Sequence, residues 1–152
     1  MREILFRART ISEDEYMDSG EWVEGFYTCF NGDEHRIYTG YSETDCGDHY
    51  PDWFNVLPET VGQFTGLTDK NGKKIFEGDI VSTKYKLGRG HYYVFEVYYN
   101  ENLCHFALTI NRGSYTKNKQ YDWLQLTSLK ANKIEVIGNI HDNPELLKGN
   151  VE

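Results

Sequence analysis

Short apolar runs alternate with turn-forming residues along this chain, at the spacing typical of β-structure. The clearest stretch runs from Val61 to Val81, V-G-Q-F-T-G-L-T-D-K-N-G-K-K-I-F-E-G-D-I-V, where apolar runs flank the pair Asn71-Gly72. Asn and Gly tolerate the positive φ angles that a tight reversal between strands requires. A second reversal follows at Gly78-Asp79. The stretch therefore predicts a rigid β-corner. It is not a phosphate-binding loop, because the Gly-Lys-Ser/Thr ending and a following helix are both missing.

Further apolar segments predict strands on both sides of this corner. Those before it lie at residues 4–9, 21–30, 35–41 and 53–57, and those after it at 80–81, 91–99, 104–110 and 133–141. Asn31-Gly32-Asp33 predicts another hairpin turn. Polar segments at 12–20, 43–52, 84–90 and 111–120 predict loops, whereas residues 121–129 fit a strand or a helical turn equally well.

The end of the chain carries two local signals. Gly138 lies inside the last predicted strand, where a glycine indicates a bulge or a bend. Asn143-Pro144 then predicts a one-turn helix, with Asn143 as its cap and proline at its first position.

Together these elements predict a mostly-β fold. Five strands after Gly78, joined by tight turns, favour a small SH3-like barrel, followed by the short C-terminal helical turn. The predicted organisation is an N-terminal acidic β-rich region over residues 1–60, and a central hairpin plus barrel over 61–152. The two regions can still form one compact unit.

Charge is distributed unevenly over the 152 residues, whose net charge is −8. Residues 1–60 hold 14 acids and 4 bases, and residues 61–152 hold 10 acids and 12 bases. Sequence-independent DNA binding depends on Lys and Arg that neutralise phosphates. Such a role is therefore disfavoured for the chain as a whole.

Two kinds of apolar segment that would indicate a cellular location are missing from the sequence. There is no long apolar segment, so no membrane association is expected, and the first residues lack the apolar stretch of a signal peptide. We therefore expect a cytoplasmic protein. Its three widely spaced cysteines, Cys29, Cys46 and Cys104, are expected to be reduced thiols that pack as small apolar groups.

Candidate chemistry is sparse. The loop Asp45-Cys46-Gly47-Asp48-His49 gathers potential metal ligands, and Cys104-His105 and His141-Asp142 offer others. Zinc sites usually show paired Cys or His at short fixed spacings, which are missing here. An exposed polar loop is the favoured interpretation, and no metal or cofactor is predicted. No nucleophile elbow or HExxH motif is present, so no catalytic residue is assigned and a hydrolase is the less favoured alternative.

Three blocks of this chain resemble the YopX family of bacteriophage and prophage proteins. They are the opening M-R-E-I-L-F-R-A, the block from Pro58 to Val81, and E-V-I-G-N-I-H-D-N-P-E-L-L from Glu135 to Leu147. The resemblance implies a β-rich fold with an SH3-like component, an intracellular phage or prophage setting, and self-association. It supplies no catalytic motif, so no functional residue is carried over.

A binding module is the favoured functional class. The strand from Tyr92 to Tyr99 carries aromatic rings on both faces, which fits a core face with cross-strand tyrosine pairs or a patch for a partner. We expect the partner to be a host or phage protein, or a second copy. A role with nucleic acid stays open, either through contact by the basic second half or through mimicry by the acidic first half. The basic residues concerned are Lys84, Lys86, Arg89, Arg112, Lys117 and Lys119.

Overall fold

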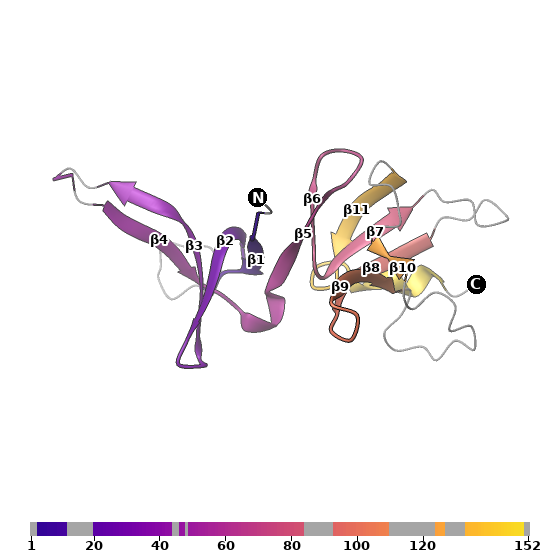
Figure 1. The fold of residues 1–152 in the computed structure, drawn as a ribbon, viewed down its shortest axis with the longest axis horizontal. Coiled ribbons are helices and arrows are strands. Elements are labelled where there is room, and N and C mark those ends of the chain that lie inside the picture. The colour runs from indigo at the N-terminus through magenta and orange to yellow at the C-terminus, as the bar shows by residue number, and fades with distance from the viewer. Residues whose placement is uncertain are drawn as a thin grey trace. The chain divides into compact units, whose positions relative to one another are not determined.

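The structure is a computed structural model that describes residues 3–11, 20–43, 46–47, 49–83, 93–109, 124–126 and 133–150. Strands dominate these residues, and the mostly-β prediction is confirmed (Figure 1). The strands are β1 (Phe6–Arg9), β2 (Trp22–Phe30), β3 (Glu34–Glu43), β4 (His49–Asn55), β5 (Gly62–Thr68), β6 (Lys74–Phe76), β7 (Asp79–Thr83), β8 (Tyr93–Asn100), β9 (His105–Thr109), β10 (Leu124–Gln125) and β11 (Ile134–Asn139). Two 3₁₀ helices, η1 (Pro58–Thr60) and η4 (Pro144–Asn150), accompany them.

The chain divides into two compact units, residues 1–64 and 65–152. The division falls inside β5, a few residues after the boundary that the charge distribution suggested. Each unit has its own hydrophobic core. The strand pairs with an assigned register are antiparallel in both.

The strands of the N-terminal unit belong to a six-stranded sheet with the order β4-β3-β2-β1-β5-β6. Its β2–β3 hairpin turns at Asn31 and Gly32, whose φ angles are 52° and 83°. Asp33 N donates to Phe30 O at 3.2 Å. Two successive positive φ angles define the type I′ turn that matches the twist of paired strands. The predicted hairpin is confirmed.

This sheet curls until the end of β4 meets the end of β1, which explains how a single sheet encloses a core. Thr10, just after β1, bridges Val56, just after β4. Leu57 N donates to Arg9 O at 2.9 Å, beside that bridge. The fully buried side chains of Ala8, Ile37 and Val56 lie on the inner face that the curl creates.

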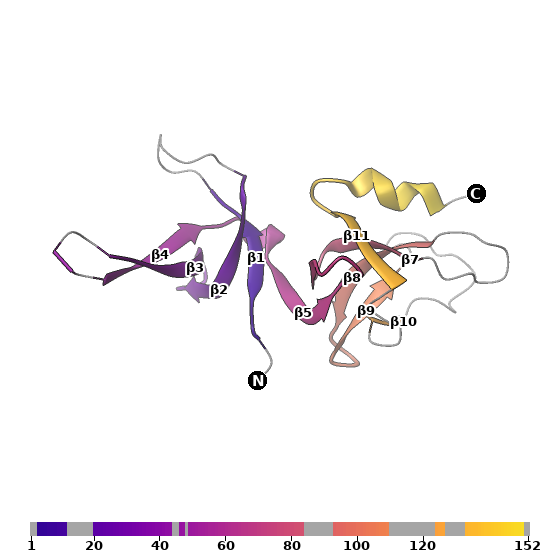
Figure 2. The same ribbon diagram turned by 90° about the horizontal axis from the view of Figure 1, so that it is seen from above.

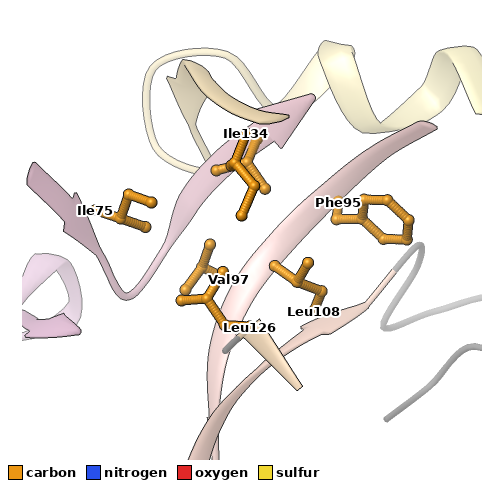
Figure 3. Packing of buried hydrophobic residues seen from close by; sticks show 7 residues of the cluster. Ile75, Phe95, Val97, Leu108, Leu126 and Ile134 are labelled. Carbon is orange, nitrogen blue, oxygen red and sulfur yellow. The ribbon is translucent and has the colours of Figure 1, made fainter. Parts of the chain in front are cut away.

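The C-terminal unit contains a five-stranded sheet with the order β10-β9-β8-β7-β11. Figure 3 shows part of its core, which gathers Phe95, Val97, Leu108 and Ile134 from three different strands, β8, β9 and β11. Five strands follow Gly78 in the part of the chain that the structure describes, as predicted. Among the described residues β10 and β11 are edge strands with no pairing between them, so closure into a barrel is not seen there.

The turn between β5 and β6 is organised by a buried carboxylate. Asp69 Oδ1 accepts hydrogen bonds from the backbone N–H groups of Asn71 (2.7 Å) and Lys73 (2.9 Å), and Oδ2 accepts one from Val136 N on β11 (3.1 Å). Gly72 has a φ of 82°, and Asp69 N donates to Lys73 O. The turn forms where Asn71-Gly72 predicted it, but only the glycine adopts positive φ.

Hydrogen bonds join the last strand, β11, to the corner around Gly78. β11 pairs with β7, with a register shift between Val136 and Gly138 that confirms the predicted bulge. Gly78 O accepts from Ile140 N at 2.9 Å, and Phe76 N donates to Asp79 Oδ2 at 2.8 Å. The second and third blocks of the family resemblance therefore meet in space. They form the framework of the C-terminal unit.

Three local features differ from expectation or extend it. β4 begins at His49, inside the segment predicted as a loop, because it pairs with the long strand β3. The C-terminal helix begins at Pro144 as predicted, but continues to Asn150 (Figure 2). Leu124–Gln125 forms a short strand within the segment that fitted either state.

Candidate binding surface on the N-terminal sheet

The outer face of the curled N-terminal sheet is rich in aromatic side chains. Side chains alternate between the two faces along a strand, so Val23 and Tyr27 of β2 contact the inner core whereas their neighbours point outward. Cross-strand register extends the outward set over β1, β3 and β4. We call this set the outer aromatic face: Trp22, Phe26, Phe30, Tyr38 and Trp53, together with Arg7, Arg9 and Arg36.

A row of three rings crosses this face. Phe26 on β2 pairs with Tyr38 on β3, which pairs with Trp53 on β4. Phe26 is 67% exposed and Trp53 is 41% exposed, while Tyr38 between them is half-buried. Large apolar side chains grouped on a surface indicate an interaction site more often than single exposed ones do.

The hairpin of β3 and β4 extends the row. A register shift between Tyr38 and Gly40 introduces one extra residue into β3, so Tyr41 pairs with Pro51. Pro51 lies two residues before Trp53 and shares its face of β4. Tyr41, which is 77% exposed, therefore lies on the same side as Trp53.

Two arginines of β1 stack on Trp22. The guanidinium carbon of Arg7 lies 4.6 Å from the Trp22 ring centroid, and that of Arg9 lies at 5.4 Å. Trp22 is opposite Arg9 in the register, which places the three side chains on one face. Cation–π contacts of this length are attractive and hold the ring in place.

Arg36 stacks on aromatic rings in the same way at the other end of the outer aromatic face. Its guanidinium carbon is 4.2 Å from the Trp53 ring centroid and 5.6 Å from that of Phe30. The group also forms an ion pair with Glu34 at 2.6 Å and donates to Asn55 Oδ1 at 3.4 Å. The planar guanidinium suits simultaneous stacking and hydrogen bonding better than an ammonium group would.

A cleft of about 500 Å³ lies beside Arg36. The β2–β3 turn contributes Asp33 and Glu34 to its wall, and Asn55 and Pro58 line it from the end of β4 onward. The cleft is thus acidic on one side and adjoins the outer aromatic face through Arg36.

On the inner face, Tyr27 and His35 form a cross-strand contact. Tyr27 Oη lies 2.5 Å from His35 Nδ1, and the rings are stacked with centroids 5.9 Å apart. Burial, together with the charge of nearby Cys29, raises the pKa of the Tyr27 hydroxyl. Tyr27 therefore stays protonated near neutral pH, when its hydroxyl is available to donate to the imidazole.

The loop from Asp45 to His49, which was considered as a metal site but favoured as an exposed polar loop, is only partly within the described residues. Asp45 and Asp48 lie outside them, and nothing is described of the His49 side chain. The described residues contain no group of three potential metal ligands.

The three cysteines, Cys29, Cys46 and Cys104, are all exposed, so the expectation that the thiols pack as small apolar groups is wrong.

The tyrosine-rich strand is split between core and surface. Phe95 and Val97 of β8 are buried, while Tyr99 is 39% exposed and meets Phe106 edge to face at 5.3 Å. Tyr99 shares the face of Phe95 and Val97, and its partner Phe106 packs against the same core, so this aromatic contact extends the core face. The predicted tyrosine pairs on the opposite face are not seen among the described residues. Tyr92 lies outside the described residues, as do Lys84, Lys86, Arg89, Arg112, Lys117 and Lys119, the basic residues considered for nucleic acid.

The outer aromatic face was not predicted as a site from the sequence. The alternation of Trp22, Phe26 and Phe30 was visible, but both sets of positions in β2 are apolar, so the pattern did not show which set is outward.

No helix in the described part of the chain is long and apolar enough to cross a membrane.

Comparisons with known proteins address the whole chain. The model of the YopX protein family matches residues 6–148, whereas no curated protein matches the chain. Among solved structures, the crystal structure of protein EF1440 from Enterococcus faecalis is similar, with a TM-score of 0.58 and 25% sequence identity, over 97% of this chain and 99% of that one. Because the family model spans nearly its entire length, the chain belongs to the YopX family.

Proposed function

We propose that this protein is a non-catalytic protein-binding module that acts in a phage or prophage setting, in the host cytoplasm. Its contact surface is the outer aromatic face. The observation that carries the proposal is the exposed row of Phe26, Tyr38 and Trp53, held on a β-framework whose own core lies on the opposite side. Tryptophan, tyrosine and arginine are the residue types most enriched among those that dominate protein–protein binding energy.

Charge favours a protein partner over nucleic acid. The first 60 residues carry a net charge of −10, which opposes the approach of a polyanion. On the outer aromatic face itself, Arg7, Arg9 and Arg36 stand beside Glu24 and Glu34, so the face is close to neutral. A nearly neutral, aromatic patch within an acidic surface fits a protein contact.

The second unit has a supporting role in this proposal. Its five antiparallel strands and the bulge in its last strand, β11, support the SH3-like type of framework that the sequence suggested. Neither unit needs a catalytic residue for such a role, and we assign none.

The test places a photo-crosslinking amino acid at position 26 of the full chain. We expect irradiation in host lysate to couple the protein to one specific protein, because Phe26 lies in the middle of the proposed contact. A matched control carries the same amino acid at Leu103, which is exposed in the β8–β9 turn of the other unit. Adducts are identified by mass spectrometry, with and without nuclease.

An adduct formed from position 26, absent from position 103 and resistant to nuclease supports the proposal. A second copy of this chain as the coupled protein supports it in its self-associating form. Equal coupling from both positions contradicts it, as does an adduct that disappears with nuclease, which would favour the nucleic-acid alternative.

A further inference from the structure

We propose that the outer aromatic face binds an extended, proline-rich segment of its partner, with basic residues flanking the prolines. The inference rests on the proposed protein-binding function and names the chemistry of what is bound. It follows from the spacing of the rings, from the way Trp53 is held, and from the charges around them.

Ring spacing matches the repeat of a polyproline II helix. Neighbouring strands lie roughly 4.8 Å apart, so Phe26 on β2 and Trp53 on β4, with Tyr38 between them, are separated by roughly 10 Å. A polyproline II helix rises about 3.1 Å per residue with three residues per turn, or roughly 9 Å per turn. Prolines three positions apart can therefore contact the two outer rings while Tyr38 contacts the segment between them.

Trp53 is held ready for such a contact. Arg36 lies 4.2 Å from its ring centroid, and Glu34 and Asn55 hold the guanidinium in turn. The ring nevertheless stays 41% exposed. A surface whose rings are held before binding loses less conformational entropy when a ligand arrives, and a proline-rich ligand loses little of its own.

The charged groups select against acidic ligands. Arg36 is engaged by Glu34 and Trp53, and Arg7 and Arg9 stack on Trp22, so each guanidinium already has contacts within the face. The surrounding region has a strong excess of carboxylates. Asp33, in the cleft beside Arg36, is placed to receive a basic flanking residue.

The experiment uses the full chain and a fluorescent decaproline peptide with an arginine at each end. The comparison peptide has the same arginines around a glycine–serine spacer, so only the prolines differ. We expect anisotropy titrations to give about tenfold tighter binding of the proline peptide, and Trp53→Ala to remove about that factor, as expected for a tryptophan that contacts the ligand directly. Tyr99→Ala, an aromatic of similar exposure in the other unit, should leave the affinity unchanged.

A measurement on the unaltered protein removes the dependence on variant folding. In amide NMR spectra, the proline peptide should shift the resonances of residues 26, 38 and 53 and leave those of β7–β9 in place. Equal binding of the two peptides overturns the inference, as does an unchanged affinity of Trp53→Ala. Tighter binding of an oligothymidine than of the proline peptide also overturns it. If position 26 still couples specifically to a protein in the crosslinking experiment, the proposed function survives that result.

Discussion

Replacing Gly25 by alanine should destabilise the N-terminal unit by about 3 kcal/mol or more. A Cβ at this position would lie 2.0 Å from the carbonyl oxygen of Tyr38 and 2.8 Å from Cγ2 of Ile37. The first of these is a backbone atom of the neighbouring strand, so relief requires moving β3 away from β2. That movement would open the inner core around Ile37. Urea unfolding followed by tryptophan fluorescence in a Trp123→Phe background, where Trp22 and Trp53 of this unit remain, measures the loss.

Gly40→Ala is the matched control. Gly40 lies in the same sheet, on β3, but a Cβ there would meet no atom within 4 Å. We expect its unfolding free energy to stay within about 0.5 kcal/mol of the original. Equal effects of the two substitutions would show that the tight approach of β3 to Gly25 is not what stabilises the curled sheet.

Local turn chemistry is what made much of the fold predictable. Asn31-Gly32 and Asn71-Gly72 both mark reversals in the structure, because these residue types accept backbone conformations that others resist. Strand positions followed from the same reasoning, since a strand must run between two turns. The start of β4 was missed because its pairing with β3 is a long-range contact, and the polar residues before Asp52 carry no periodic pattern.

The binding surface was harder to predict than the fold. In β2 both alternating sets are apolar or aromatic, with Trp22 and Phe26 in one set and Val23 and Tyr27 in the other. The curl of the sheet determines which of the two sets faces outward, and this curl depends on the bridge from Thr10 to Val56. A contact over that sequence distance leaves no local signal in the chain.

Framework and contact surface occupy different parts of this chain. The second and third blocks that resemble the YopX family meet around Asp69 and Gly78, where backbone and carboxylate hydrogen bonds join β11 to the rest of its unit. The row of Phe26, Tyr38 and Trp53 lies between the first and second blocks. One part of the sequence thus supports the fold, and a separate part supplies the surface that we propose to bind a partner.

Asp69→Asn should destabilise the C-terminal unit by about 2–4 kcal/mol at neutral pH. The carboxylate is only 5% exposed and accepts hydrogen bonds from the backbone N–H groups of Asn71, Lys73 and Val136. An asparagine oxygen could replace Oδ1, but its NH₂ group would then face the N–H of Val136, donor against donor. Urea unfolding, with amide exchange at residues 73 and 136 as the local measurement, tests this expectation.

Glu135→Gln is the control for loss of a carboxylate near the same turn. Glu135 pairs with Lys70 at 2.5 Å, but both side chains are about one-third exposed. Exposed ion pairs contribute about 0–1 kcal/mol, so the change in unfolding free energy should be within that range. A larger loss from Glu135→Gln than from Asp69→Asn would contradict the assignment of Asp69 as the residue that organises the corner.

The pH dependence gives a second test of Asp69. Removal from water alone would raise its pKa, but the backbone hydrogen bonds from Val136, Lys73 and Asn71, with the charge of Lys73, lower it below its ordinary value. A carboxyl whose pKa is lower in the folded state stabilises that state above the unfolded pKa of about 3.9, and the contribution is lost as the pH falls through the folded value. The stability difference between the original protein and Asp69→Asn should therefore be constant above about pH 5 and shrink on acidification below pH 4. A difference that instead grows on acidification would mean that Asp69 is protonated in the folded protein, and the hydrogen-bond argument for this corner would fail with it.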